Sequence, residues 1–105
     1  MEAKDVVYNV TIDPSANDRI IEHFEFLAQV SETAADNLLD QLLEDIHSLE
    51  KMPYRNPVYG RLYVPVEKYR YMISAERYRI VYQIIQDNVF VDDIQDCRQE
   101  EQLTI

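Results

Sequence analysis

The sequence has very little glycine or cysteine and no long apolar run, and each scarcity excludes a class of protein. Gly60 is the single glycine, so glycine-rich phosphate-binding loops are excluded. Cys97 is the single cysteine; it has no partner for an internal disulfide and suits a reducing compartment. Because no apolar run approaches about 18 residues, we expect no membrane span. The start, MEAKDVVYNV, lacks the features of a signal peptide, so we expect a cytoplasmic protein.

Acidic residues outnumber basic residues by 20 to 10, but the two kinds are unevenly distributed. Residues 1–50 contain twelve acids and two bases, and residues 80–105 contain six acids and one base. Residues 51–79 contain two acids and a basic band of seven residues: Lys51, Arg55, Arg61, Lys68, Arg70, Arg77 and Arg79. A local positive potential can bind an anion even though a net charge of −10 weakens the approach of a polyanion.

Residues 69–94 carry the strongest secondary-structure pattern, three β-type runs joined by two short polar breaks. The runs are Tyr69–Ser74, Arg77–Ile85 and Val89–Ile94, rich in branched and aromatic residues that suit a half-buried sheet. Connections this short predict a three-stranded antiparallel meander. In the middle run, alternation assigns Tyr78, Ile80, Tyr82 and Ile84 to one face and Arg77, Arg79, Val81 and Gln83 to the other. We expect the first face to be covered and the second to be open.

The preceding residues predict an edge strand and a helical hairpin. Val6–Ile12 alternates like a strand, and Asp13 and Ser31 suit the N-caps of two helices. Apolar residues follow helical spacing at Ile20, Ile21, Phe24, Leu27 and Ala28, and again at Ala35, Leu38, Leu39, Leu42, Leu43, Ile46 and Leu49. A proline-containing loop with a short strand at Arg61–Val64 follows. The predicted order is β-αα-βββ, an α+β fold with the hairpin on one face of a small antiparallel sheet, in one domain over residues 1–105.

Each polar candidate also has a purely structural interpretation. The stem of Arg79 can cover apolar surface, and Arg98 can form an ordinary surface ion pair. Lys68, Arg70 and Arg77 fit a solvated face. The carboxylates of Asp92, Asp93 and Asp96 do not predict a metal site, since adjacent strand residues point to opposite faces. We expect no metal and no cofactor.

Four blocks, in this order and spacing, resemble the RelE/ParE superfamily of toxins from bacterial type II toxin–antitoxin systems. YNVTIDPSA resembles the opening strand and its break into the first helix. LEKMPYRNP resembles the end of the second helix and the loop that follows it. RYRIVYQI is similar to the family's aromatic-Arg-apolar-Val-Tyr strand, and VFVDDIQDCRQE resembles its last strand and the arginine beyond it. The resemblance covers nearly the whole chain and implies the same fold and a cognate antitoxin as partner.

In the ribosome-dependent members of this superfamily, arginines stabilise the phosphate during cleavage of mRNA. The resemblance implies that Arg79 and Arg98 are catalytic, while Lys68 or Arg70 takes the cationic position one strand earlier. Arg77 and Tyr71 are candidate RNA-binding residues beside them. The implied reaction is attack of an RNA 2′-oxygen on its own phosphorus, and planar guanidinium donors suit the resulting charge. The implied function is therefore a toxin that inhibits translation, with the ribosome and mRNA as partners.

The sequence departs from the nuclease pattern in its general acid and base. The tail EEQLTI has no tyrosine or histidine, and the loop after the second helix has no carboxylate before Glu67. Tyr54, Tyr59, Tyr69 or Tyr71 could donate a proton or stack on a base, but the sequence selects none of them. Two alternatives follow: a ParE-like poison of DNA gyrase without catalysis, and a non-toxic relative that retains only antitoxin binding. The acidic charge predicts an antitoxin that is less acidic than usual.

Overall fold

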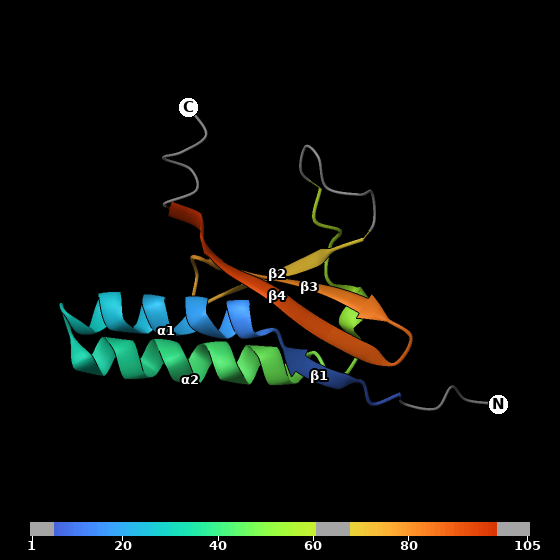
Figure 1. Ribbon diagram of the computed structural model, residues 1–105, viewed down its shortest axis with the longest axis horizontal. Helices are drawn as coiled ribbons and strands as arrows, with labels where there is room; N and C mark the ends of the chain where they lie inside the picture. Colours follow the sequence, from blue (N-terminus) through green and yellow to red (C-terminus); the bar gives the residue numbers. More distant parts are fainter. Residues whose placement is uncertain (1–5, 61–67, 99–105) are drawn as a thin grey trace.

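A computed structural model of the chain describes residues 6–60 and 68–98. In chain order its elements are β1 (Asn9–Ile12), α1 (Pro14–Ala28), α2 (Glu32–Ser48), the short 3-10 helix η1 (Pro53–Arg55), β2 (Arg70–Ser74), β3 (Tyr78–Ile85) and β4 (Asn88–Asp96). Figure 1 shows α1 and α2 as a hairpin on one side of the sheet, with the free end of the hairpin reaching past the sheet. The predicted α+β class and the order β-αα-βββ are confirmed.

The four strands lie in the order β1-β4-β3-β2. β2, β3 and β4 form the predicted antiparallel meander. β1 lies parallel to β4, with Val10 opposite Val89, so the sheet predicted to be antiparallel is mixed. Parallel neighbours require a long crossover, which the helices and the first two meander strands provide here. The first and last of the described strands, β1 and β4, are therefore neighbours.

Both helices begin at the predicted caps. The Asp13 carboxylate accepts a hydrogen bond from the Ser15 N–H (3.0 Å), and Pro14 occupies the first helical position, where its missing N–H costs nothing. The Ser31 hydroxyl accepts from the Ala34 N–H (3.1 Å). These bonds satisfy N–H groups that have no partner within the helix. The short connection between the caps folds the two helices back on each other.

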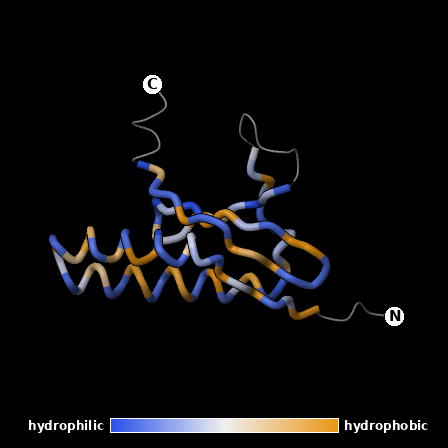
Figure 2. The backbone as a smooth tube through the Cα atoms, viewed as in Figure 1, coloured by the Kyte–Doolittle hydropathy of each residue, from blue (hydrophilic) through white to orange (hydrophobic). Residues whose placement is uncertain are grey.

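The hydrophobic core lies between the hairpin and one face of the sheet. Figure 2 shows hydrophobic positions recurring along both helices and along the strands that face them. The core residues include Ala16, Ile20, Leu38, Leu42, Ile46, Leu49, Tyr78, Ile80, Tyr82, Val89, Val91 and Ile94. The predicted covered face of β3 is thus confirmed, with Ile84 packing against its rim. Ile21 and Leu43, assigned to the apolar stripes, are each 45% exposed, because each sits at the edge of its stripe.

The loop after α2 is held against the sheet by its own hydrogen bonds. The buried hydroxyl of Tyr82 donates to the Pro53 carbonyl (2.6 Å) and accepts from the Asn56 side chain (3.0 Å). Farther along, the Tyr71 N–H donates to the Pro57 carbonyl (3.1 Å). The loop therefore runs beside β2 and crosses to the sheet face that the hairpin leaves uncovered.

The sequence predicted that the second face of the sheet is open, but in the structure part of this face is covered. Tyr59, at the end of this loop, is buried, and its hydroxyl and ring contact side chains of the second face. Val81, assigned to the open face, is only 4% exposed. A residue from a loop, whose position the strand pattern does not encode, covers part of the surface.

The predicted N-terminal strand is shorter than expected, since pairing begins at Asn9 rather than Val6. The predicted strand at Arg61–Val64 lies outside the described residues. Within residues 6–60 and 68–98, neither helix has the length and apolar character that a membrane crossing requires.

Candidate functional site

Arg79 lies on the second face of the sheet between two tyrosine rings. Its guanidinium carbon is 5.5 Å from the ring centres of both Tyr59 and Tyr71, a distance at which cation and ring attract. Its Nη1 donates to the Gln95 side-chain oxygen (2.9 Å), and the Gln95 amide donates to the Tyr59 hydroxyl (3.2 Å). We call these four residues the Arg79 cluster. The structure thus brings two of the predicted site residues together, Arg79 and Tyr71.

A small hollow adjoins this cluster. Val58, Tyr59, Gly60, Tyr71 and Arg79 enclose about 200 Å³. Typical ligand pockets enclose roughly 300–1,000 Å³, so this hollow has room for little more than one side chain or one small group. The planar guanidinium and the two rings offer it a cationic, aromatic wall.

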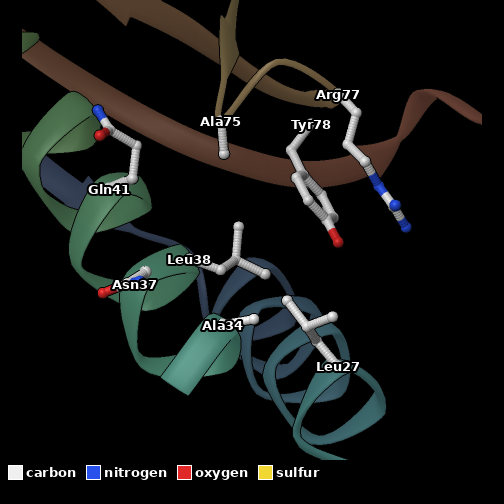
Figure 3. Close-up of a pocket in the computed structure, with 8 residues that line it drawn as sticks. All are labelled: Leu27, Ala34, Asn37, Leu38, Gln41, Ala75, Arg77 and Tyr78. Atoms are coloured by element: carbon white, nitrogen blue, oxygen red, sulfur yellow. The ribbon is translucent and has the colours of Figure 1, made fainter. Parts of the chain in front are cut away.

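Arg77 lies outside the Arg79 cluster, beside Asp96 and Tyr78. Its Nη2 is 2.8 Å from the carboxylate of Asp96, which is 4% exposed, and Tyr78 is paired with Asp96 across the strands. Figure 3 shows Arg77 and Tyr78 pointing together toward the helices. Burial alone would lower the pKa of Arg77, but the hydrogen bond and charge of Asp96 raise that pKa above its ordinary value. The assignment of Arg77 to the same face as Arg79 is therefore wrong, because β3 begins only at Tyr78 and Arg77 precedes the regular alternation.

Lys68 and Arg70 form a third group. Both line a hollow with Tyr54 and Ile84. Arg70 donates to the carbonyl oxygens of Asn56 (2.6 Å) and Tyr54 (3.2 Å), and its guanidinium carbon lies 5.1 Å from the Tyr54 ring centre. Arg70 is the register partner of Tyr82, whose side chain faces the core, so it lies at the rim of the face that the hairpin covers. Its contacts hold the loop after α2.

Arg98, the second predicted catalytic residue, is exposed just beyond β4. Its backbone N–H donates to the Asp96 carboxylate (3.0 Å), which also pairs with Arg77. Asp96 therefore ties Arg98 to the Arg77 group and not to the Arg79 cluster. The predicted cationic site residues therefore divide among three places on the molecule, and Lys51 and Arg55 of the basic band lie together at a fourth.

Sequence reasoning missed Gln95 and Asp96, the two partners of the arginines. Tyr59 was considered only as one of four equivalent tyrosines. The meander pattern offered a signal, since residues on neighbouring strands at equal distances from a turn face each other. A bulge between Val81 and Tyr82 shifts that register, so Arg79 pairs with Gln95. An unshifted count from the turn would have placed Arg79 opposite Ile94.

The titratable side chains beside Arg79 are those of Tyr59 and Tyr71 and the Asp93 carboxylate, which accepts a hydrogen bond from the Gln95 amide (3.3 Å). Burial raises the pKa of both Tyr78 and Tyr82, which keeps their hydroxyls protonated. Burial also raises the pKa of Asp92, although the hydrogen bond from Gln83 (2.7 Å) opposes this effect. Across residues 6–60 and 68–98, His, Cys, Asp and Glu side chains do not gather in threes as a metal ion would require.

Comparisons with known proteins agree with the fold. Residues 10–101 match the sequence profile of a family described as the ParE toxin of the type II toxin–antitoxin system parDE. A solved structure from P. aeruginosa, titled as a chromosomal ParDE toxin–antitoxin system, superimposes with a TM-score of 0.71. The match covers 86% of this chain and 96% of that chain at 9% identity, so it shows a shared fold. No curated protein sequence matches the chain.

Proposed function

Because the chain belongs to the ParE toxin family of type II toxin–antitoxin systems, we propose that it acts by binding DNA gyrase and that it does not cleave mRNA. The family membership makes the chain a toxin-type protein with a cognate antitoxin. The choice of target is the proposed part. Of the two activities that the sequence suggests, binding of DNA gyrase and cleavage of mRNA, we propose the first.

The observation that carries this choice is the engagement of the arginines by the protein itself. Arg79 is hydrogen-bonded to Gln95 and held between two rings, Arg77 is paired with Asp96, and Arg70 is bonded to loop carbonyls. A phosphate clamp needs several cationic donors that converge on one point. These three side chains are directed to three separate places instead.

Recruiting Arg79 to a phosphate would also cost free energy. A hydrogen bond made by a charged group contributes about 1.5–3 kcal/mol, and an exposed cation–π contact about 0.5–1 kcal/mol. Displacing the guanidinium would break its bond to Gln95 and move it away from both tyrosines. Binding to a protein target avoids this cost, because surface side chains can contact a partner protein while they keep their contacts within the chain.

The charge of the chain supports the same choice. At a net charge of −10, the field of the whole protein opposes approach to mRNA on a ribosome, which is dense in phosphates. Binding to a protein surface depends on local complementarity and is less affected by that field. Three of the basic residues that would have to overcome this field, Arg70, Arg77 and Arg79, are held apart by contacts within the chain.

The test compares two targets with one protein preparation. Purified wild-type protein and Arg79→Ala are added to a gyrase supercoiling reaction and to a cell-free translation reaction in which mRNA 5′ ends are mapped. We expect wild type to inhibit supercoiling or trap cleaved DNA while mRNA stays intact. Cleavage within ribosome-bound codons that is lost in Arg79→Ala would overturn the proposal and establish the nuclease. Normal supercoiling together with intact mRNA would also overturn it and leave the non-toxic relative.

A further inference from the structure

A group of basic residues adjoins the short helix η1, which lies at the end of the molecule opposite the free end of the hairpin (Figure 1). The described residues 51–60 and 68–75 contain no acidic residue and four basic ones: Lys51, Arg55, Lys68 and Arg70. The first two line a hollow of about 380 Å³ at the end of α2, and the last two line a smaller hollow with Tyr54. Because Tyr54 and Arg55 are consecutive residues of η1, the two hollows are adjacent. We call this surface, with Met52 and Tyr54, the η1 patch.

The folded chain holds two of the bases beside η1. Arg70 donates to the carbonyl oxygens of Asn56 (2.6 Å) and Tyr54 (3.2 Å), and Arg55 donates to a carbonyl oxygen of the preceding turn (2.8 Å). Burial raises the pKa of Tyr82, whose hydroxyl bonds to η1, and the Asn56 hydrogen bond and the charges of Arg70 and Arg55 oppose that rise. Both guanidinium groups therefore act on one hydroxyl group, so their positive charges add in one place.

Acidic residues border the η1 patch but do not neutralise it. Glu50 lines the hollow at the end of α2, where its carboxylate lies 3.5 Å from Nε2 of His47. Burial raises the pKa of Asp92, and the hydrogen bond from Gln83 and the charge of Lys68 oppose that rise. Within residues 6–60 and 68–98, however, none of the four bases forms an ion pair with a carboxylate, in contrast to Arg77.

The electrostatics of the fold explains only half of this patch. Cations are favourable near the C-terminal end of a helix, which accounts for Lys51 and Arg55 just beyond α2. The same effect does not account for Lys68 and Arg70, which lie at the start of β2. Like charges gathered on one surface repel each other. On a chain with a net charge of −10, the patch indicates a negatively charged partner.

The η1 patch also presents apolar surface. Met52 is 70% exposed and Tyr54 is 56% exposed, and the guanidinium carbon of Arg70 lies 5.1 Å from the Tyr54 ring centre. Tyrosine, methionine and arginine are the residue types enriched where proteins bind one another. The phosphates of duplex DNA attract cations but offer an exposed methionine no apolar contact. An acidic protein surface can satisfy both parts of the patch.

From these observations we propose that the η1 patch is the surface that docks on DNA gyrase, and that it binds an acidic protein surface there. Met52 and Tyr54 lie at the centre of the contact, and the bases surround them. The proposal rests on the proposed function and adds the docking surface and the chemistry of its counterpart. Both bonds of Arg70 leave from Nη1, so its other N–H groups can donate to a carboxylate while these bonds are kept. Opposite charges also steer the two proteins together.

The charge test measures the affinity of the labelled full chain for purified gyrase without DNA. Lys51→Glu reverses one charge of the patch at an exposed side chain. The matched control is Gln29→Glu with Thr33→Glu, which adds the same charge of −2 at exposed positions at the free end of the hairpin. We expect Lys51→Glu to weaken binding by about fivefold or more, through slower association and less so at high salt. The control should change the affinity by less than about twofold.

A second pair of variants tests the apolar centre. Met52→Ser removes an exposed apolar side chain from the patch, and Val30→Ser does so at the free end of the hairpin, where Val30 is 80% exposed. We expect Met52→Ser to weaken gyrase binding by about tenfold at every salt concentration, because no charge changes. Val30→Ser should bind as wild type does. Circular dichroism confirms beforehand that all variants are folded.

The outcomes distinguish failure of the patch from failure of the proposed function. If wild type does not bind gyrase, the proposed function is refuted and the docking surface with it. If wild type binds and Lys51→Glu binds as tightly as its control, the patch is overturned while gyrase remains the target.

Two further measurements identify other occupants of the patch. Wild type and Lys51→Glu are mixed with duplex DNA alone, and separately with the product of the gene adjoining their own. DNA binding by wild type that Lys51→Glu loses would assign the patch to nucleic acid. A loss of affinity for the adjoining gene's product as large as the loss for gyrase would assign it to the antitoxin. Either result would overturn the proposal, and we expect neither.

Discussion

Replacing Tyr82 by phenylalanine should destabilise the protein through the loop after α2. The ring of Tyr82 is completely buried, so phenylalanine fills the same space and leaves the core packing unchanged. The hydroxyl is the part that matters, because it donates to the Pro53 carbonyl and accepts from Asn56. Its removal deletes both bonds at once and leaves a buried carbonyl without this donor.

The magnitude follows from what each partner loses. A buried acceptor left unsatisfied costs about 1–3 kcal/mol, while the partly buried Asn56 amide can turn to water and costs less. We expect a loss of about 2 kcal/mol in the free energy of unfolding. For a chain of this size, 1 kcal/mol lowers the melting temperature by about 4–8 °C, so the melting temperature should fall by roughly 10 °C.

Urea denaturation of wild type and Tyr82→Phe measures the effect directly. The midpoint should fall while the slope stays constant, since the surface exposed on unfolding is the same. Tyr54→Phe is the matched control, because Tyr54 lies in the same loop with its side chain 56% exposed, and we expect a change within 0.5 kcal/mol. A loss below 0.5 kcal/mol in Tyr82→Phe would refute the idea that this hydroxyl anchors the loop.

Two further predictions concern the remaining buried polar groups. Arg77→Ala should lower the free energy of unfolding by about 2 kcal/mol in urea titrations, less than the 3–5 kcal/mol of a fully buried pair because Arg77 is 29% exposed; an unchanged midpoint would contradict the pairing with Asp96. The protein should also lose stability as pH rises above about 10, because unfolded tyrosines ionise there while burial holds the pKa of Tyr78 and Tyr82 higher in the fold. Thermal melts from pH 8 to pH 11 check the sign, and a melting temperature that rises over this range would contradict it.

Local patterns predicted the elements of this fold because each element is specified by nearby residues. Asp13 and Ser31 cap the helices that their side chains predict, and Tyr78, Ile80 and Tyr82 occupy the covered face that alternation assigns to them. The neighbour of β1 was not predictable in this way. Nothing in residues 9–12 records that their partners lie at residues 88–91, so the parallel pair appears only in three dimensions.

The site was predicted less completely than the fold, for two physical reasons. The first is the bulge between Val81 and Tyr82. It shifts by one residue every pair of β3 and β4 that lies beyond it from the β3–β4 turn, and so places Gln95 opposite Arg79. The second is the loop that carries Tyr59 across the sheet, since a loop position depends on tertiary contacts such as those of Tyr82. Counting charges along the sequence therefore identified the basic residues, but it could not show that they lie at separate places on the folded molecule.

The pairing of β1 with β4 has a consequence for synthesis of the protein. Strand β1 is made before both helices, and its partner β4 is made after the helices and two further strands. The hairpin, whose apolar side needs the sheet as cover, is therefore synthesised before the surface that buries it, and contacts this distant in sequence form slowly. A growing chain consequently stays incompletely folded, and exposes that apolar side, until β4 has been translated. A toxin built in this way acquires its folded shape only once β4 has joined the sheet, and an antitoxin already present in the cell can meet it at that point.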